Sequence, residues 1–290
     1  MSNALASLTP SPAIGATSHG VDIAPWQPAL GEVVSGFRYS GRPVPEDLQA
    51  TFKRLLYTRG ALVFEPGTVT AQNFTDFVRV FGEPAPYSGP HTPTAPDNPS
   101  ATVVDSRNDE RLRNHIWHID GTFRKNAPKI TALFGHTIPD RGGDTLFSNA
   151  VLAYDLLDPK FAAYLDTLIA IDSADATGHL AERYLDPEQQ ARERAKMPPY
   201  EHPVIRVHPE TGKKQIVVNE SYTAYIKGVS RTVSQSLLAI LFDAIKAPEV
   251  QARYTWTPGA LVVWDNRVVQ HKGIKDYGSS HRLLYRATLN

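Results

Sequence analysis

The stretch RLRNHIWHIDGTFR, residues 111–124, places two histidines and an aspartate within six residues. His118 and Asp120 are two positions apart, so they point to different sides of a helix but share one face of a strand. The β-branched and aromatic residues of HIWHID, followed by GTF, predict a strand that runs into a turn. Because His-x-Asp also occurs by chance, this segment alone allows either a metal-binding pair or two polar residues on an ordinary strand.

A second stretch, VVWDNRVVQH (262–271), favours the metal site. His271 follows the strongly β-forming run Leu261–Trp264 and the turn-like pair Asp265-Asn266. Two histidines and one carboxylate form the facial arrangement that leaves open positions on non-haem Fe(II). A structural zinc site is more often closed by four ligands.

The composition excludes several other classes of site. The 290 residues include no cysteine, which excludes disulfides, iron–sulfur clusters, thiolate zinc sites and a cysteine nucleophile. Thirty basic residues balance thirty acidic ones, so no net field favours nucleic acid or an anionic membrane. No window approaches the roughly 20 apolar residues of a membrane span, and the N-terminus lacks the features of a secretory signal. We therefore expect a cytoplasmic protein.

Helices and strands are indicated along most of the chain. Apolar residues at helical spacing predict helices over 45–60, 70–82 and 233–248. Two β-branched runs around Pro-Glu-Thr-Gly predict a hairpin over 203–219. The predicted helices come first along the chain, with strands around and after them. This order predicts an α+β fold, mainly β, with a mostly antiparallel core. Residues 1–20 are expected to form a loose arm, and the polar segment 172–199 either a surface helix or a mobile lid.

The last predicted strand, RLLYRATL (282–289), carries two arginines on one face. Its alternation places Arg282 and Arg286 on the side opposite Leu283 and Tyr285. One interpretation is a half-exposed strand with solvated arginines. The other is a strand whose polar face lines a barrel interior and offers two guanidinium groups to two anions. Together with the histidines, the second suits an oxygenase that uses 2-oxoglutarate and an acidic substrate.

At these residues the sequence resembles the taurine dioxygenase family of Fe(II)/2-oxoglutarate-dependent oxygenases, which includes chlorophenoxyacetate dioxygenases and alkylsulfatases. The matching segments are WHIDGTF (117–123), GGDT (142–145), HPVIRVHPETGKKQIVVNESYT (202–223), WDNRVVQH (264–271) and DYGSSHRLLYRATL (276–289). The resemblance covers nearly the whole chain. It implies a single domain over residues 21–290 with a double-stranded β-helix core, a cupin-like jelly roll, and flanking helices.

The resemblance also implies the roles of individual residues. His118, Asp120 and His271 match the Fe(II) ligands. Thr145 matches the threonine that hydrogen-bonds the distal carboxylate of 2-oxoglutarate, and Arg282 the arginine that pairs with that carboxylate. Arg286 matches the arginine that holds the anionic group of the substrate.

Four further residues are candidate substrate contacts. Asn114 matches a polar contact, although a loop asparagine bonded to its own backbone is an equal alternative. Tyr222 matches an aromatic residue of the substrate pocket, or is a core aromatic. Taurine dioxygenases carry a histidine and a tyrosine after the FGE motif; here Tyr87 and Pro90 stand at those positions, with His91 one further on. The taurine pattern is therefore not reproduced.

The implied function is an Fe(II)- and 2-oxoglutarate-dependent dioxygenase that uses O2, hydroxylates a small anionic substrate and releases succinate and CO2. Cleavage follows where the hydroxylated carbon bears a leaving group. The expected partner is a sulfonate, sulfate ester or carboxylate, not nucleic acid or a membrane, and the family suggests a homo-oligomer. Two alternatives stay open: an oxygenase that tailors a natural-product intermediate, and an inactive metal-binding scaffold.

Overall fold

The computed structural model describes residues 15–16, 19–85, 93–107, 114–178 and 186–290. Its helices within these ranges are α1 (Glu46–Arg59), α2 (Phe74–Val78), α3 (Ala150–Asp155), α4 (Pro159–Leu165), α6 (Pro187–Lys196) and α7 (Arg231–Lys246), with a 3-10 turn, η3 (Pro248–Val250). The predictions for residues 1–14, 86–92, which include Tyr87 and His91, and 179–185 concern residues outside the described ranges.

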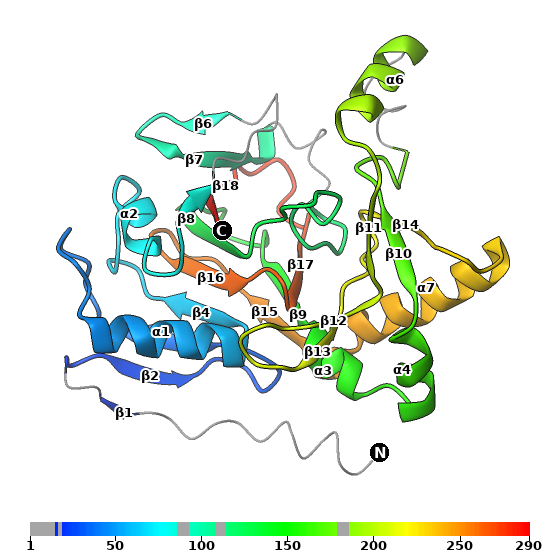
Figure 1. Cartoon of the computed structure of the whole chain (residues 1–290). Coiled ribbons are helices and arrows are strands. Elements are labelled where there is room, and N and C mark those ends of the chain that lie inside the picture. The colour runs from blue at the N-terminus through cyan, green and yellow to red at the C-terminus, as the bar shows by residue number, and fades with distance from the viewer. Residues whose placement is uncertain (1–14, 17–18, 86–92, 108–113, 179–185) are drawn as a thin grey trace.

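The strands form one large sheet and three small ones (Figure 1). In the large sheet the order is β1 (Gly15–Ala16), β2 (Asp22–Pro25), β3 (Glu32–Ser35), β4 (Ala61–Phe64), β16 (Leu261–Asp265), β8 (Ile130–Thr137), β18 (Leu283–Leu289), β7 (Asn98–Asp105) and β6 (Thr94–Ala95), with β5 (Pro84–Ala85) on β18. A smaller sheet has the order β15 (Gln251–Tyr254), β9 (Thr145–Asn149) and β17 (Val269–Gly273). The others are β11 (Tyr200–Pro203), β10 (Ile169–Asp172) and β14 (Thr223–Ile226), and the pair β12 (Ile205–Val207) and β13 (Lys214–Ile216).

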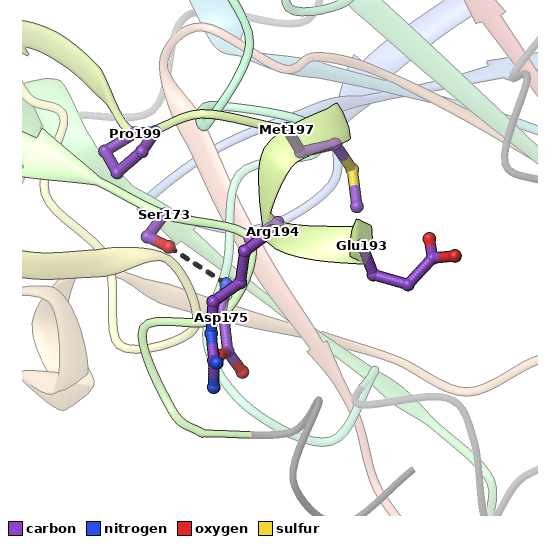
Figure 2. A pocket seen from close by; sticks show the side chains of 7 residues that line it. Ser173, Asp175, Glu193, Arg194, Met197 and Pro199 are labelled. Carbon is purple, nitrogen blue, oxygen red and sulfur yellow. Dashed lines mark hydrogen bonds and ion pairs between the residues drawn. The ribbon is translucent and has the colours of Figure 1, made fainter. Parts of the chain in front are cut away.

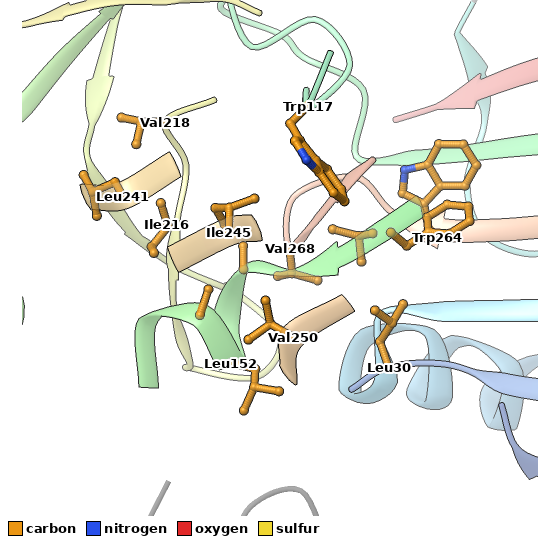
Figure 3. Close-up of a cluster of buried hydrophobic side chains, with 14 of the residues drawn as sticks. Leu30, Trp117, Leu152, Ile216, Val218, Leu241, Ile245, Val250, Trp264 and Val268 are labelled. Atoms are coloured by element: carbon orange, nitrogen blue, oxygen red, sulfur yellow. The ribbon is translucent and has the colours of Figure 1, made fainter. Parts of the chain in front are cut away.

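The large sheet has an apolar core on each face. On β18, Leu284 belongs to one cluster of buried side chains, whereas Tyr285 and Ala287 belong to the other. The first cluster joins the large sheet to β9, β15 and β17, and Figure 3 shows Trp264 and Val268 within it. The second packs against α1 and α2. This division follows from the period-2 alternation of strand side chains, and it confirms the alternation predicted for residues 282–289.

Most of the predicted elements are present. The helix expected at 45–60 is α1, and Gly60 ends it with a φ of 82°, a conformation that costs glycine little. The helix expected at 233–248 is α7, which begins earlier because the Ser230 hydroxyl accepts a hydrogen bond from the backbone of Val233. The hairpin expected at 203–219 is β12–β13, with Ile205 opposite Ile216.

The helix predicted over 70–82 is shorter than expected. Only Phe74–Val78 is α-helical. Before and after it the backbone forms i→i−3 hydrogen bonds, from Asn73 to Thr70 and from Val80 to Phe77. These tighter turns are common at helix ends, so the apolar spacing is kept while the α-helix is not.

The segment predicted as a surface helix or lid contains α6, which lies beyond the ends of β10 and β11 (Figure 1). Asp186 caps its N-terminus, and none of its residues is buried. A surface helix is therefore present at Pro187–Lys196, and the lid stays a prediction. Among the described residues, no helix is both long enough and apolar enough to cross a membrane.

Candidate functional site

His118 and His271 are held side by side by their backbones. The N–H of His118 donates to the carbonyl of His271 at 3.1 Å, and the N–H of His271 donates to the carbonyl of His118 at 3.0 Å. This isolated antiparallel bridge attaches His118 to β17. The two imidazole rings are consequently 4.1 Å apart between centroids.

The strand predicted over HIWHID is wrong, because His115 lies in a turn, Ile116 in a bend and Trp117 in irregular backbone. Among the described residues of this stretch, only His118 makes a β-bridge, and Asp120 already lies in a turn. A side chain replaces the missing strand partner: Oδ1 of Asn266 accepts from the N–H of Asp120 at 2.9 Å, and its Nδ2 donates to the Asp120 carbonyl at 3.0 Å. An amide side chain has one acceptor and one donor, so it can make the same two hydrogen bonds as a neighbouring strand. The side chains of His118 and Asp120 therefore still point to the same side of the chain.

His118, Asp120 and His271 form a group that fits a metal ion. One ligand atom from each lies within 4.8 Å of the others. All three residues are buried, with 3% to 7% of their surface exposed. Two imidazole nitrogens and one carboxylate oxygen are the donors of the non-haem Fe(II) facial triad. The prediction that these three residues lie together is therefore confirmed.

Neighbouring groups fix which atoms of His118 and Asp120 face the site. Nδ1 of His118 is 2.8 Å from the carbonyl of Ile116, so it carries the proton and leaves Nε2 as the acceptor. The Thr131 hydroxyl donates to Oδ2 of Asp120 at 3.0 Å. Oδ1 of Asp120 lies 3.7 Å from Nε2 of His118. Nε2 of His118 and Oδ1 of Asp120, the two atoms left to bind a metal, are thus adjacent.

Electrostatics favour the protonation states that a metal requires. Burial lowers the pKa of His118, and burial together with the neighbouring His118 lowers the pKa of His271 to about 3. Burial alone would raise the pKa of Asp120, but the Arg286 guanidinium and the hydrogen bond from the Thr131 hydroxyl act against it, and its pKa is lowered. Both imidazoles are therefore neutral and the carboxyl is ionised at neutral pH, as metal ligands must be.

Arg286 reaches the same group of residues from the large sheet. Its Nη1 is 3.5 Å from Oδ1 of Asp120, and its Nε donates to the Thr102 hydroxyl at 3.4 Å. The side chain is 16% exposed, which contradicts a solvated arginine. A guanidinium at this place can attract an anion directly beside the metal group.

Arg282 and Thr145 form a second polar centre. Nη2 of Arg282 donates to Oγ1 of Thr145 at 3.3 Å, and the indole Nε1 of Trp256 donates to the same oxygen at 2.9 Å. Because Oγ1 accepts both bonds, its own proton is left for an acceptor such as a carboxylate. Arg282 is only 5% exposed, so the interpretation of a solvated arginine is wrong here too.

Gly143 makes room for Arg282. The carbonyl of Gly143 accepts from Nε of Arg282 at 2.6 Å. A Cβ at residue 143 would lie 2.9 Å from Cδ of Arg282, and the residue has a φ of 75°. Both the close approach and the left-handed backbone require glycine. The GGDT motif thus positions Arg282 as well as supplying Thr145.

Of the remaining predicted substrate contacts, two lie near the proposed metal ligands and two lie outside the described residues. Tyr222 presents its ring to His118, with centroids 6.4 Å apart at 84°, and packs on Phe123 at 4.8 Å. The carbonyl of Asn114 accepts from the N–H of Gly273, two residues after His271 on β17. Tyr87 and His91 are not among the described residues.

A separate depression lies between the end of β10 and α6 (Figure 2). Asp175 and Arg194 line it and pair with each other, with Nε of Arg194 2.7 Å from the Asp175 carboxylate. It includes none of the residues predicted to bind metal, 2-oxoglutarate or substrate.

Sequence reasoning missed three residues that organise the site: Thr131, Trp256 and Asn266. Nothing in the pattern distinguishes Thr131 or Trp256 from ordinary strand residues. Asn266 is part of the matching segment WDNRVVQH, where it was interpreted only as a turn residue. It is completely buried, and an asparagine that closes a strongly apolar run was the signal that could have identified it.

Comparisons with known proteins agree over most of the chain. Residues 22–288 match the family described as taurine catabolism dioxygenase TauD, TfdA family. The chain is 35% identical over 217 residues to an alkylsulfatase of Acinetobacter baylyi, covering 73% of this chain and 67% of the relative. It is 29% identical over 278 residues to an alpha-ketoglutarate-dependent sulfate ester dioxygenase of Pseudomonas putida, covering 93% and 89%. A crystal structure of a taurine dioxygenase from Burkholderia xenovorans superimposes with a TM-score of 0.76 at 28% identity, covering 93% and 90%.

Proposed function

Because the chain belongs to the TauD, TfdA family, we propose that its substrate is a small organic sulfate ester. The protein is an Fe(II)- and 2-oxoglutarate-dependent dioxygenase that acts on a small anionic organic compound. Two relatives support the narrower class, since one is named an alkylsulfatase and the other a sulfate ester dioxygenase. Arg286 beside the metal group offers the positive charge that an anionic group of the substrate needs, whichever of these classes it belongs to.

The proposed core is a double-stranded β-helix. The large sheet and the sheet β15-β9-β17 share one apolar cluster, and two mostly antiparallel sheets around one core are typical of a jelly roll. Residues 21–290 would form this single domain. The proposed metal group joins these two sheets, because His271 is on β17 of the smaller sheet while Arg286 is on β18 of the large one.

His118, Asp120 and His271 would hold Fe(II). The single observation that carries this assignment is the convergence of their ligand atoms to within 4.8 Å in a buried setting. When bound, iron with 2-oxoglutarate and O2 supplies the oxidising power, and the co-substrate becomes succinate and CO2. The protein contributes the ligands, their orientation and a water-poor environment.

Thr145 and Arg282 would hold the distal carboxylate of 2-oxoglutarate. The Thr145 hydroxyl has one proton to donate, because Trp256 and Arg282 already donate to its oxygen. Arg282 adds a buried positive charge, and charge-assisted hydrogen bonds of this kind are strong. Gly143 keeps the guanidinium in place by leaving room for its stem.

Arg286 would bind the sulfate group of the substrate and so place a neighbouring C–H toward the metal group. Hydroxylation of the carbon that bears the ester oxygen gives a compound that breaks its C–O bond to sulfate. The products are then an aldehyde and hydrogen sulfate, alongside succinate and CO2. Tyr222 would pack against the organic part of the substrate, and Asn114, Tyr87 and His91 are proposed polar contacts.

Three probes with the same alkyl chain test this proposal: hexyl sulfate, hexanesulfonate and heptanoate. With Fe(II), 2-oxoglutarate and O2, hexyl sulfate should yield hexanal and inorganic sulfate in equal amounts with succinate. Preferred turnover of hexanesulfonate with sulfite release, or of heptanoate, would contradict the sulfate ester class. Absence of any oxygen-dependent succinate formation, with a broad panel of acids, would favour the inactive scaffold instead.

A further inference from the structure

Asn266 connects the two chain segments that carry the proposed metal ligands. It follows β16 directly and precedes β17, the strand of His271. Its side chain bonds both backbone groups of Asp120, as described above, and its Nδ2 also donates to the carbonyl of Pro128 at 2.8 Å. One fully buried amide thus holds the backbone of Asp120 next to the segment that leads into β17.

The two ends of the segment 118–120 are held in different ways. At one end, His118 is attached to His271 by two backbone hydrogen bonds. At the other end, no strand pairs with the backbone of Asp120 among the described residues, and the Asn266 amide supplies the equivalent pair of bonds. Loss of the amide would therefore leave His118 in place and release Asp120 selectively.

Among the described residues other than the proposed metal ligands, two contact the Asp120 carboxylate: the Thr131 hydroxyl on Oδ2 and Arg286 on Oδ1. Neither of these holds its backbone. The direction in which the Asp120 side chain leaves the main chain depends on that backbone. The geometry of the carboxylate relative to the two imidazoles consequently depends on Asn266.

We propose that Asn266 is a positioning residue for the metal centre: it acts as a substitute strand partner that aligns Asp120 with His118 and His271. This inference rests on the proposed metal site. Asn266 itself would contact neither the substrate nor the metal. Partners that orient metal ligands from outside the coordination sphere typically contribute about 10–100-fold to metal affinity.

The test compares Asn266→Ala with Asn98→Ala in the full chain. Asn98 is a matched control because it is also a buried amide, it donates to the carbonyls of Ala71 and Gln72, and it lies at the start of β7. Binding of Mn(II) to the apo-protein is followed by the electron paramagnetic resonance of the free ion. Thermal unfolding of each apo-protein reports the loss of stability separately.

Both variants should lose stability, but only Asn266→Ala should weaken Mn(II) binding, by about 10-fold or more. Equal Mn(II) affinity of Asn266→Ala and wild type, with lowered stability, would overturn the proposal and leave Asn266 a purely structural residue. If Asn266→Ala does not fold, Asn266→Ser replaces it under the same criterion. If wild type itself binds no Mn(II), the proposed metal site fails, which is distinguishable from failure of the inference.

Discussion

Nη1 of Arg286 lies 3.5 Å from Oδ1 of Asp120, the carboxylate oxygen that does not accept the Thr131 hydrogen bond. An anion bound by Arg286 would therefore sit immediately beside the proposed metal position. Arg282, four residues earlier on the same chain segment, instead contacts Thr145. The two arginines thus serve two separate anion positions, and each can be tested independently.

Arg286→Ala should raise the substrate KM while leaving the KM for 2-oxoglutarate within about twofold. A lost charge-assisted hydrogen bond costs about 1.5–3 kcal/mol, which corresponds to roughly 10–100-fold. Arg282→Ala should show the opposite pattern. Steady-state kinetics with each compound varied in turn checks both variants. Equal losses of both affinities in Arg286→Ala would mean that the two roles are misassigned.

Gly143→Ala should weaken 2-oxoglutarate binding by displacing Arg282. Its Cβ would lie 2.9 Å from Cδ of Arg282. Gly212→Ala is the matched control, because Gly212 has a similar φ of 68° but a Cβ there meets nothing within 4 Å. Both substitutions carry a left-handed backbone cost of about 1–2 kcal/mol, so both lose stability. Unchanged 2-oxoglutarate affinity in Gly143→Ala, measured by calorimetry with Mn(II), would rule out this role.

Thr131→Val should weaken metal binding without changing the shape of the core. The hydroxyl that orients Oδ2 of Asp120 is removed, and the expected loss of Mn(II) affinity is about 10-fold. Thr75→Val, which removes a buried hydroxyl bonded to Asn98, serves as the control and should bind Mn(II) like wild type. Similar Mn(II) affinities for the two variants would refute the orienting role of Thr131.

Asp265 should make the apo-protein sensitive to acid. Burial would raise its pKa, but hydrogen bonds from His208 and Arg267 outweigh this, and its pKa is lowered. A lowered pKa in the folded state contributes stability above the unfolded pKa of about 3.9, and this stability is lost as pH falls through the folded value. Asp265→Asn should be less stable at pH 7 and should lose less of its unfolding free energy on acidification.

Urea denaturation of both apo-proteins at several pH values between 7 and 3 measures this difference. Parallel pH dependence of the unfolding free energy in wild type and Asp265→Asn would show that Asp265 is not the responsible group.

Local sequence patterns were sufficient for the elements whose signals are local. The apolar stripe of α1, the turn residues of the β12–β13 hairpin and the alternation on β18 each predict their own structure. The three proposed metal ligands were predictable because their residue types and the strand-like spacing of His118 and Asp120 indicate the same chemistry.

What could not be predicted depends on partners far away in the sequence. The segment after His118 resembles a strand, yet its neighbour is the side chain of Asn266 and not another strand. Likewise, Thr131 and Trp256 acquire their roles only when folding places them beside Asp120 and Thr145. No local pattern encodes which distant residue each of these side chains contacts.

Anaerobic titration of the apo-protein with Fe(II) and 2-oxoglutarate tests the central claim most directly. Wild type should develop the visible metal-to-ligand charge-transfer band that a chelating 2-oxo acid gives with ferrous iron, and His271→Ala should not. Addition of hexyl sulfate should then shift the band. No band in a folded wild-type protein, with His118, Asp120 and His271 intact, would contradict the proposed iron and 2-oxoglutarate site.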